Sequence, residues 1–198
     1  MVRTREFDPH TALGTIVELF AAKGYTDTSM EDIVRATGVS RYGLYGTFGS
    51  KRELFEQALD RYAERMGKQS FLRLLEPDAS LDSIRQIFDE RIEDMCSAGG
   101  QKSCLFIHTT MELAPENEEL RAVMQKFMGR MAKMFSIGLG AARERGELRA
   151  DLDVRAVGDQ LTSLMFGLAI LARAGYRREA LESLVGTTLA ALKPPSPA

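Results

Sequence analysis

The chain has 198 residues, of which 44% are hydrophobic and 27% are charged, and its formal net charge is −2 at pH 7. This length and composition predict one or two folded domains with a substantial core and exclude an extended disordered protein. We find no apolar leader, no cysteine framework and no sign of a membrane partner, so we expect a cytoplasmic protein.

The distribution of charge along the sequence neither indicates nor excludes a nucleic-acid partner. Up to Arg52 the chain carries seven basic residues and six acidic ones. Binding to DNA would therefore rest on a few placed contacts and a symmetric dimer, because no basic surface is expected to attract the phosphates at long range.

The first helix is predicted to start at Asp8-Pro9, a capping residue followed by a proline in the first helical position, and to end at Gly24. Its apolar residues recur at helical spacing, which indicates a packing role and no chemistry. Strand-period alternation is absent along the whole chain, so the predicted fold class is all-α.

A second helix is predicted within the stretch from Thr28 to Lys51. Thr28 is followed three residues later by Glu31, which is the spacing of a capping box, so the helix should start at Ser29 or Met30. The glycine that follows this helix permits the left-handed backbone that closes a helix.

A third helix is predicted only two residues after that glycine, Gly38. Ser40 is placed to cap it, and it runs from Arg41 to about Gly46. Two short helices around a glycine turn, the second with an outward polar face, form the helix-turn-helix pattern, whose second helix lies in the DNA major groove.

Ser50 then caps a long helix that is predicted to reach Met66 or Gly67. Lys51 lies in its first turn, where backbone N–H groups and the helix dipole favour an anion. Lys51 is either a contact to one DNA phosphate or an ordinary solvated lysine.

The order and spacing of residues from about 8 to 55 are more specific than any single motif. The residues concerned are Phe20, Gly24, Tyr25, Thr28, Ser29, Asp32, Ile33, Gly38, Val39, Ser40, Leu44, Tyr45, Phe48, Lys51, Leu54 and Phe55. They resemble the N-terminal signature of the TetR family of transcriptional regulators.

This resemblance implies a homodimeric regulator, a repressor that binds a palindromic operator in double-stranded DNA. It implies a DNA-binding domain over residues 1–50, a connecting helix over about 51–67, and a ligand-binding and dimerisation domain over 68–198. The residues expected at the DNA are Thr28, Ser29, Ser40, Arg41, Tyr42, Gly43, Tyr45, Thr47 and Lys51.

The C-terminal part is predicted to hold five helices. They start near Leu81, Cys104, Glu118, Val154 and Arg177. Seven of the ten methionines lie between residues 95 and 165, and these flexible side chains either line a pocket for a small apolar effector or fill an ordinary core. The proposed pocket residues are Met95, Phe106, Thr110, Met111, Phe127, Met131 and Phe166.

The last two helices carry more apolar residues than one small core needs, and a dimer surface is expected there. Its predicted members are Leu161, Leu164, Leu168, Leu181, Leu184, Val185 and Thr188. An effector that prefers one geometry of the dimer would change the affinity for DNA only by its differential affinity for the two states.

Cys104 and His108 lie four residues apart and would share a helix face. No third residue completes a catalytic group or a metal site, so we expect no enzyme activity, no metal and no cofactor. The alternative function is a helical small-molecule-binding or thiol-redox-sensing protein with a degenerate DNA-binding domain, in which Cys96 or Cys104 is the switch.

Overall fold

The computed structural model describes residues 7–66, 70–97, 105–112 and 115–195. Every regular element within these ranges is helical, which confirms the all-α prediction. The internal contacts divide the chain into two compact units, residues 1–65 with 104–121 and residues 66–103 with 122–198.

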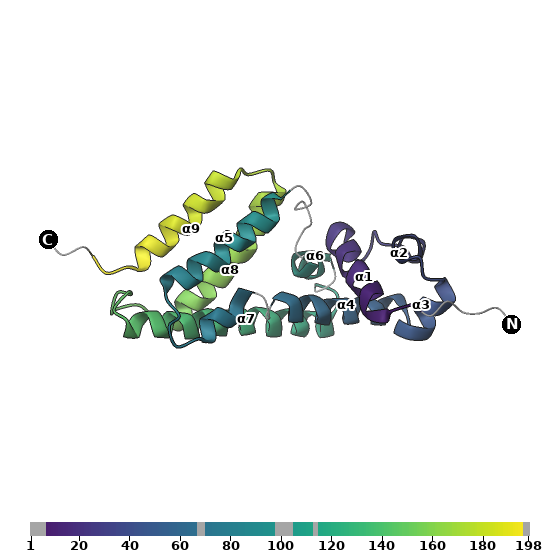
Figure 1. Cartoon of the computed structure of the whole chain (residues 1–198), viewed down its shortest axis with the longest axis horizontal. Helices are drawn as coiled ribbons and strands as arrows, with labels where there is room; N and C mark the ends of the chain where they lie inside the picture. The colour runs from purple at the N-terminus through teal and green to yellow at the C-terminus, as the bar shows by residue number, and fades with distance from the viewer. Residues whose placement is uncertain (1–6, 67–69, 98–104, 113–114, 196–198) are drawn as a thin grey trace. The chain divides into compact units, whose positions relative to one another are not determined.

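The first unit is built from the helices that Figure 1 draws in purple and blue, together with α6. These helices are α1 (Pro9–Lys23), α2 (Met30–Thr37), α3 (Arg41–Phe48), α4 (Lys51–Met66) and α6 (Leu105–Glu112). Within this unit α2 packs against α1 and α3, and α6 packs against α1.

Local chemistry sets the ends of α1 as the sequence predicts. The Asp8 carboxylate accepts hydrogen bonds from the N–H groups of His10 and Thr11 at 3.1 and 3.0 Å, and Pro9 stands in the first turn. Gly24 ends the helix with a φ of 82°, a backbone conformation that is strained for residues with a side chain.

An aromatic cluster forms the centre of the first unit. The ring of Phe55 in α4 lies with its centroid 4.9 Å from the rings of both Phe20 and Tyr25. Phe20 and Phe55 are fully buried. The cluster thus joins α1, the turn after it and α4 through large apolar surfaces.

The second unit contains α5 (Leu81–Cys96), most of α7 (Glu118–Glu144), α8 (Val154–Arg173), α9 (Arg178–Leu192) and the 3₁₀ helix η2 (Leu72–Leu75). In this unit α5, α8 and α9 pack against one another (Figure 1). Phe135 of α7 stands at the core, with its ring centroid 5.1 Å from that of Phe71 and 5.7 Å from that of Phe88.

The helix bounds follow the predicted ones closely, with two differences. Helix α3 continues to Phe48, because this residue is buried together with Leu44 and completes the inner face of the helix. The 3₁₀ helix η2 was not predicted, since four residues are too few to show a periodic pattern.

The compact units also differ from the predicted division near residue 67. Residues 104–121 belong to the N-terminal unit. Within it the ring of Phe106 lies 5.3 Å from that of Tyr62, and the carboxylate of Glu112 bonds the backbone N–H of Tyr25. These contacts join segments that are far apart in the sequence, so no local sequence pattern predicts them.

Helix α8 is long and apolar enough to cross a membrane by length and composition, and 33% of its most apolar stretch is buried. One face packs into the second unit through Val157, Leu161 and Leu168, which are all buried. Other apolar side chains remain on the surface, among them Ile170, which is 52% exposed. The apolar excess of α8 is thus divided between a core face and an outer face.

A close approach of α8 to α7 requires a glycine at position 158. A Cβ added to Gly158 would lie 2.4 Å from the Ser136 Oγ and 2.6 Å from the backbone oxygen of Ala132. Gly158 therefore lets α7 and α8 approach closely within one chain.

Replacing Gly158 by alanine should lower the free energy of unfolding by about 1–3 kcal/mol, because the backbone oxygen of Ala132 has no room to move aside. The control is Gly129→Ala in α7, where an added Cβ meets nothing within 4 Å. That variant should gain about 0.5–1 kcal/mol from helix propensity. Denaturant unfolding at one fixed protein concentration measures both, and equal stability of Gly158→Ala and the unmodified chain would contradict the packing argument.

Candidate nucleic-acid interface

Ser29 caps α2, not Thr28. The Ser29 Oγ accepts the N–H of Asp32 at 3.1 Å, and the Asp32 carboxylate accepts the N–H of Ser29 at 3.1 Å. The predicted capping box of Thr28 with Glu31 is therefore wrong by one residue, although α2 begins at Met30 as expected.

Thr28 has a structural role. Its side chain is fully buried, and its hydroxyl donates to the backbone oxygen of Gly24 at 2.6 Å. The prediction that Thr28 lies at the DNA is wrong for its side chain in this structure, because the hydroxyl is used to hold the turn between α1 and α2.

The Asp32 carboxylate ties the start of α2 to the end of α1. Hydrogen bonds from the hydroxyl and N–H of Ser29, together with the nearby ammonium of Lys23, lower the pKa of Asp32 to about 2. The Lys23 Nζ lies 3.2 Å from a carboxylate oxygen of Asp32. The carboxylate thus satisfies N-terminal donors of α2 and binds a residue of the preceding helix.

The turn from α2 to α3 is closed by its own polar groups. Gly38 adopts the left-handed conformation with a φ of 69°, and the Thr37 hydroxyl oxygen accepts the N–H of Val39 at 3.2 Å. Ser40 then caps α3 by accepting the N–H of Gly43 at 3.1 Å. Three residues therefore set the direction of α3 relative to α2.

Helix α3 separates an apolar inner face from a polar outer one. Leu44 and Phe48 are buried, whereas Tyr42 is 86% exposed and Tyr45 is 41% exposed. Gly43 is half-buried. All other predicted DNA contacts on α3 and at the caps of α2 and α3 are exposed, namely Ser29, Ser40, Arg41, Tyr42, Tyr45 and Thr47.

Arg41 is held across the two helices. Its guanidinium bonds the carboxylate of Glu31 at 2.7 Å, and its central carbon lies 5.7 Å from the ring centroid of Tyr45. Both members of this ion pair are more than half exposed, so the pair contributes little to stability and is easily exchanged.

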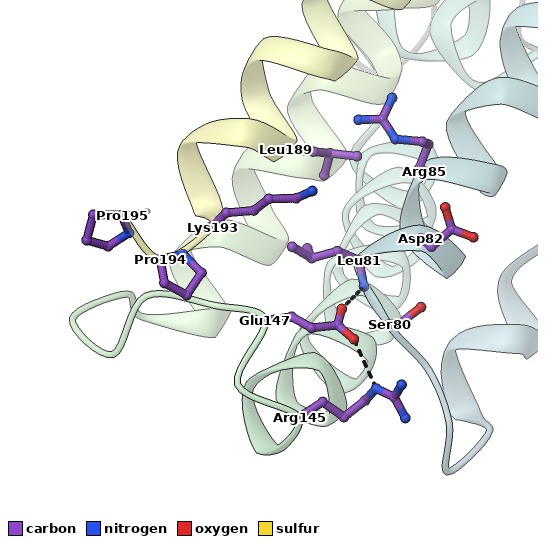
Figure 2. A pocket seen from close by; sticks show the side chains of 10 residues that line it. All are labelled: Ser80, Leu81, Asp82, Arg85, Arg145, Glu147, Leu189, Lys193, Pro194 and Pro195. Carbon is purple, nitrogen blue, oxygen red and sulfur yellow. Dashed lines mark hydrogen bonds and ion pairs between the residues drawn. The ribbon is translucent and has the colours of Figure 1, made fainter. Parts of the chain in front are cut away.

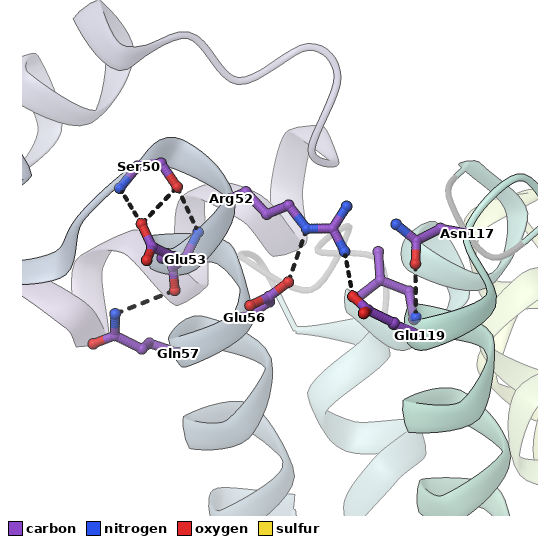
Figure 3. A network of polar contacts seen from close by, with 8 residues as sticks. Ser50, Arg52, Glu53, Glu56, Gln57, Asn117 and Glu119 are labelled. Atoms are coloured by element: carbon purple, nitrogen blue, oxygen red, sulfur yellow. Dashed lines mark hydrogen bonds and ion pairs between the residues drawn. The ribbon is translucent and has the colours of Figure 1, made fainter.

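Lys51 stands over an aromatic ring at the start of α4. Its Nζ lies 4.3 Å from the ring centroid of Tyr25, and burial lowers the pKa of this ammonium. Figure 3 shows Ser50 and Glu53 closing the first turn of α4: Ser50 accepts the N–H of Glu53 at 3.2 Å, and Glu53 accepts the N–H of Ser50 at 2.7 Å.

Glu112, at the end of α6, reaches the same place. Its carboxylate accepts the N–H of Tyr25 at 3.1 Å and acts electrostatically on Lys51. A Cβ on Gly24 would lie 2.6 Å from a carboxylate oxygen of Glu112, so only glycine leaves room for this bond. Sequence reasoning missed Glu112, because 87 positions separate it from Tyr25.

A second polar link connects α4 to the start of α7. The Arg52 guanidinium lies 2.9 Å from a carboxylate oxygen of Glu56 and 3.6 Å from one of Glu119 (Figure 3). Asn117 caps α7 by accepting the N–H of Leu120 at 3.0 Å. The first turn of α4 is therefore linked to the start of α7 by an ion pair and is acted on by the charge of Glu112 at the end of α6.

The chain matches two families along most of its length. Residues 13–58 match the family described as "Bacterial regulatory proteins, tetR family", and residues 80–187 match the family described as "Tetracyclin repressor-like, C-terminal domain". The chain belongs to the TetR family. It is a DNA-binding transcriptional regulator, and its family is one of regulators and not of enzymes.

Relatives of similar length support this assignment. The chain is 30% identical over 97% of its length to the uncharacterized HTH-type transcriptional regulator YezE of Bacillus subtilis (strain 168), all of which is covered. It is 29% identical over 94% of its length to the HTH-type transcriptional repressor ComR of Escherichia coli (strain K12), of which 90% is covered.

A solved structure shows the same TetR fold on DNA. It is a cysteine mutant of the TetR family transcriptional regulator CifR, complexed with a 26-bp double-strand operator DNA. The likeness has a TM-score of 0.83 and 27% identity, and it covers 96% of this chain and 99% of the other.

The predicted effector residues are divided between the two compact units. Phe106, Thr110 and Met111 lie on α6 in the first unit, where Phe106 is buried and Met111 is 72% exposed. The others lie in the second unit: Met95, Phe127, Met131 and Phe166. Each unit taken by itself does not bring the whole set together, so the TetR-type effector pocket stays a prediction.

The predicted dimer surface needs correction. Leu161 and Leu168 of α8 and Leu181 and Val185 of α9 are fully buried inside one chain, where α5, α8 and α9 pack together. The apolar periodicity that suggested a partner belongs to this internal core. The predicted residues that remain accessible are Leu164, Leu184 and Thr188.

Of the predicted thiol and metal residues, Cys104 lies outside the described residues. Cys96 is a free, exposed cysteine at the end of α5, and it contacts the side chain of Arg178. Among the residues that the structure describes, no group of three His, Cys, Asp or Glu side chains is placed to hold a metal ion.

The low pKa of Asp32 predicts a pH-dependent stability. A lowered pKa in the folded state stabilises the fold above the pKa of the unfolded chain, about 3.9, and this contribution is lost as pH falls towards the folded value of about 2. Asp32→Asn should therefore be less stable than the unmodified chain at pH 7, and the difference should shrink steadily below about pH 5.

Thermal unfolding between pH 7 and pH 3 measures this difference. Asp27→Asn is the matched control, since Asp27 is exposed and makes no hydrogen bond to a described residue. A constant difference between Asp32→Asn and the unmodified chain over the whole range would show that the carboxylate does not stabilise α2.

Proposed function

We propose that this TetR-family regulator is a repressor that binds a palindromic operator as a homodimer in the cytoplasm, with α3 in the major groove. The observation that carries the proposal is the division of α3 into two faces. Leu44 and Phe48 fix the helix to its unit, while Arg41, Tyr42 and Tyr45 face solvent. An exposed aromatic pair beside a guanidinium supplies both base contacts and phosphate contacts.

Arg41 is the proposed residue for direct contact with DNA. Its exposed bond to Glu31 is weak, so a phosphate or a guanine edge replaces the carboxylate at small cost. The ring of Tyr45 lies beside the same guanidinium on the exposed side of α3. Tyr42 has no comparable contact to lose when it meets DNA, because its ring packs against little of its own chain.

Lys51 is the proposed phosphate anchor. It stands in the first turn of α4, where N–H groups and the helix dipole favour an anion, and the ring of Tyr25 limits its motion. Because the ammonium is already partly desolvated, less hydration is lost when a phosphate approaches. This contact would fix the register of the protein on DNA without reading sequence.

The proposed effector is a small apolar molecule bound in the C-terminal part of the chain. Its effect would reach the DNA-binding helices through residues 105–121. A displacement of α6 would remove Glu112 from Tyr25 and change the surroundings of Lys51. A displacement of the start of α7 would remove Glu119 from Arg52. The effector regulates operator binding only if it binds one of these arrangements more tightly than the other.

The first test is selection of bound sequences from a random pool of double-stranded DNA at about 150 mM salt, which suppresses loose phosphate contacts. We expect a palindrome to be enriched. Tyr42→Ala should then weaken binding to this operator by about tenfold or more while thermal stability is unchanged, because the Tyr42 side chain is 86% exposed.

The control for Tyr42→Ala is Tyr176→Ala, which removes an exposed tyrosine, 53% accessible, from the second unit. It should leave operator affinity unchanged. Enrichment of no sequence, either alone or with cell extract added to supply an effector, would contradict operator binding. Equal affinity of Tyr42→Ala and the unmodified chain would contradict the assigned role of α3.

The proposed dimer surface lies on the outer faces of α8 and α9, around Leu164, Leu184 and Thr188. Leu184 is 40% exposed within one chain. These side chains would bury their apolar area only against a second copy.

Leu184→Glu should convert the dimer to a monomer at micromolar concentration, because it would place an unpaired charge in an apolar interface. Light scattering measures the mass. Ser183→Glu adds the same charge to the neighbouring exposed position of α9 and should leave the dimer intact. A Leu184→Glu variant that stays dimeric would remove this surface from consideration.

A further inference from the structure

A cavity of about 670 Å³ lies in the second unit, apart from every residue predicted to bind the effector. It is formed where the start of α5, the connection from α7 to α8 and the end of α9 meet (Figure 2). Its volume is in the range of small-molecule sites. The lining residues are Ser80, Leu81, Asp82, Arg85, Arg145, Glu147, Leu189, Lys193, Pro194 and Pro195.

The floor of the cavity is apolar and fixed. Leu81 and Leu189 are 6% and 1% exposed, so both side chains belong to the core of the unit as well as to the cavity wall. Pro194 and Pro195 continue the apolar wall beyond α9. A ligand with a hydrocarbon body would find a preformed surface here.

The carboxylate of Glu147 is already engaged. It accepts the N–H of Leu81 at the start of α5 at 2.8 Å, and it bonds the Arg145 Nε at 2.9 Å. Burial alone would raise the pKa of Glu147, but these two donors and the charge of Lys193 keep it below its ordinary value. Glu147 therefore stays ionised as a structural link between α5 and the α7–α8 connection.

Two further cations, Arg85 and Lys193, share the cavity, and Lys193 acts on Glu147 through its charge without a direct bond. Among the described residues, neither the Arg85 guanidinium nor the Lys193 ammonium forms a hydrogen bond or an ion pair within 4 Å. Figure 2 shows both side chains directed towards the space beside Leu189, whereas the Asp82 carboxylate points away. Asp82 accepts a hydrogen bond from Gln86 at 2.9 Å. Two like charges that converge over apolar residues repel each other unless an anion lies between them.

We propose that this cavity binds a small organic carboxylate, with its anionic group between Arg85 and Lys193 and its hydrocarbon part on Leu81 and Leu189. The planar guanidinium of Arg85 suits the two oxygens of a carboxylate, and Lys193 adds a mobile second charge. The site does not depend on the operator or on the predicted effector pocket. It is a separate ligand site on the regulator.

Isothermal titration with octanoate tests the site, with octanamide as the neutral probe of equal length. Octanoate should bind and raise the melting temperature, since it binds the folded state. Octanamide should bind about tenfold more weakly or not at all, because it lacks the charge that Arg85 and Lys193 require. Equal binding of both probes, or no binding of octanoate, would overturn the proposal.

A double variant, Arg85→Gln with Lys193→Gln, locates the site. It should weaken octanoate binding by about tenfold or more, with the melting temperature of the free protein unchanged. The matched control is Lys133→Gln with Arg173→Gln, which removes the same charge from exposed positions of the second unit outside the cavity. Unchanged binding in the cavity variant, or equal loss in both variants, would show that octanoate does not bind between Arg85 and Lys193.

Discussion

The packing of Phe55 against Phe20 and Tyr25 is the contact on which the DNA-binding unit depends. Phe20 comes from α1, Tyr25 from the turn after it and Phe55 from α4, so one cluster fixes three segments. Tyr25 then serves two further groups: Lys51 stands over its ring, and Glu112 binds its N–H. The proposed phosphate contact and the proposed coupling to the C-terminal part are therefore both set by the position of one aromatic residue.

Helix α3 shows why a DNA-reading helix relies on its surroundings. It has only eight residues and contains two glycines, so it would not be stable as an isolated helix. Ser40 closes its first turn, and Leu44 and Phe48 anchor its inner face. The inner face and the N-terminal cap thus hold this short helix in place. The residues on the outer face are not required for packing, so their identity can be set by the contacts that they make with the operator.

The second unit uses its apolar residues in three ways. Leu161, Leu168, Leu181 and Val185 fill the space among α5, α8 and α9, whereas Leu184 and Ile170 stay at the surface. Leu81 and Leu189 are core residues whose outer edge forms the floor of the cationic cavity. Hydropathy alone does not separate these uses, because the same residue types serve all of them.

The sequence by itself determined the positions of the α-helices, the caps of α1 and α3 and the helix-turn-helix, because periodicity, Asp8-Pro9, Gly38 and Ser40 act within a few residues of each other. It also determined the outward position of Arg41, Tyr42 and Tyr45, which follows from Leu44 and Phe48 facing inward. Only the tertiary structure decided that Thr28 is buried, that Ser29 is the cap and that Leu161 and Val185 face their own chain. It alone brought Glu112 to Tyr25 and Lys193 into one cavity with Arg85, since contacts between distant segments depend on how helices pack and leave no local pattern.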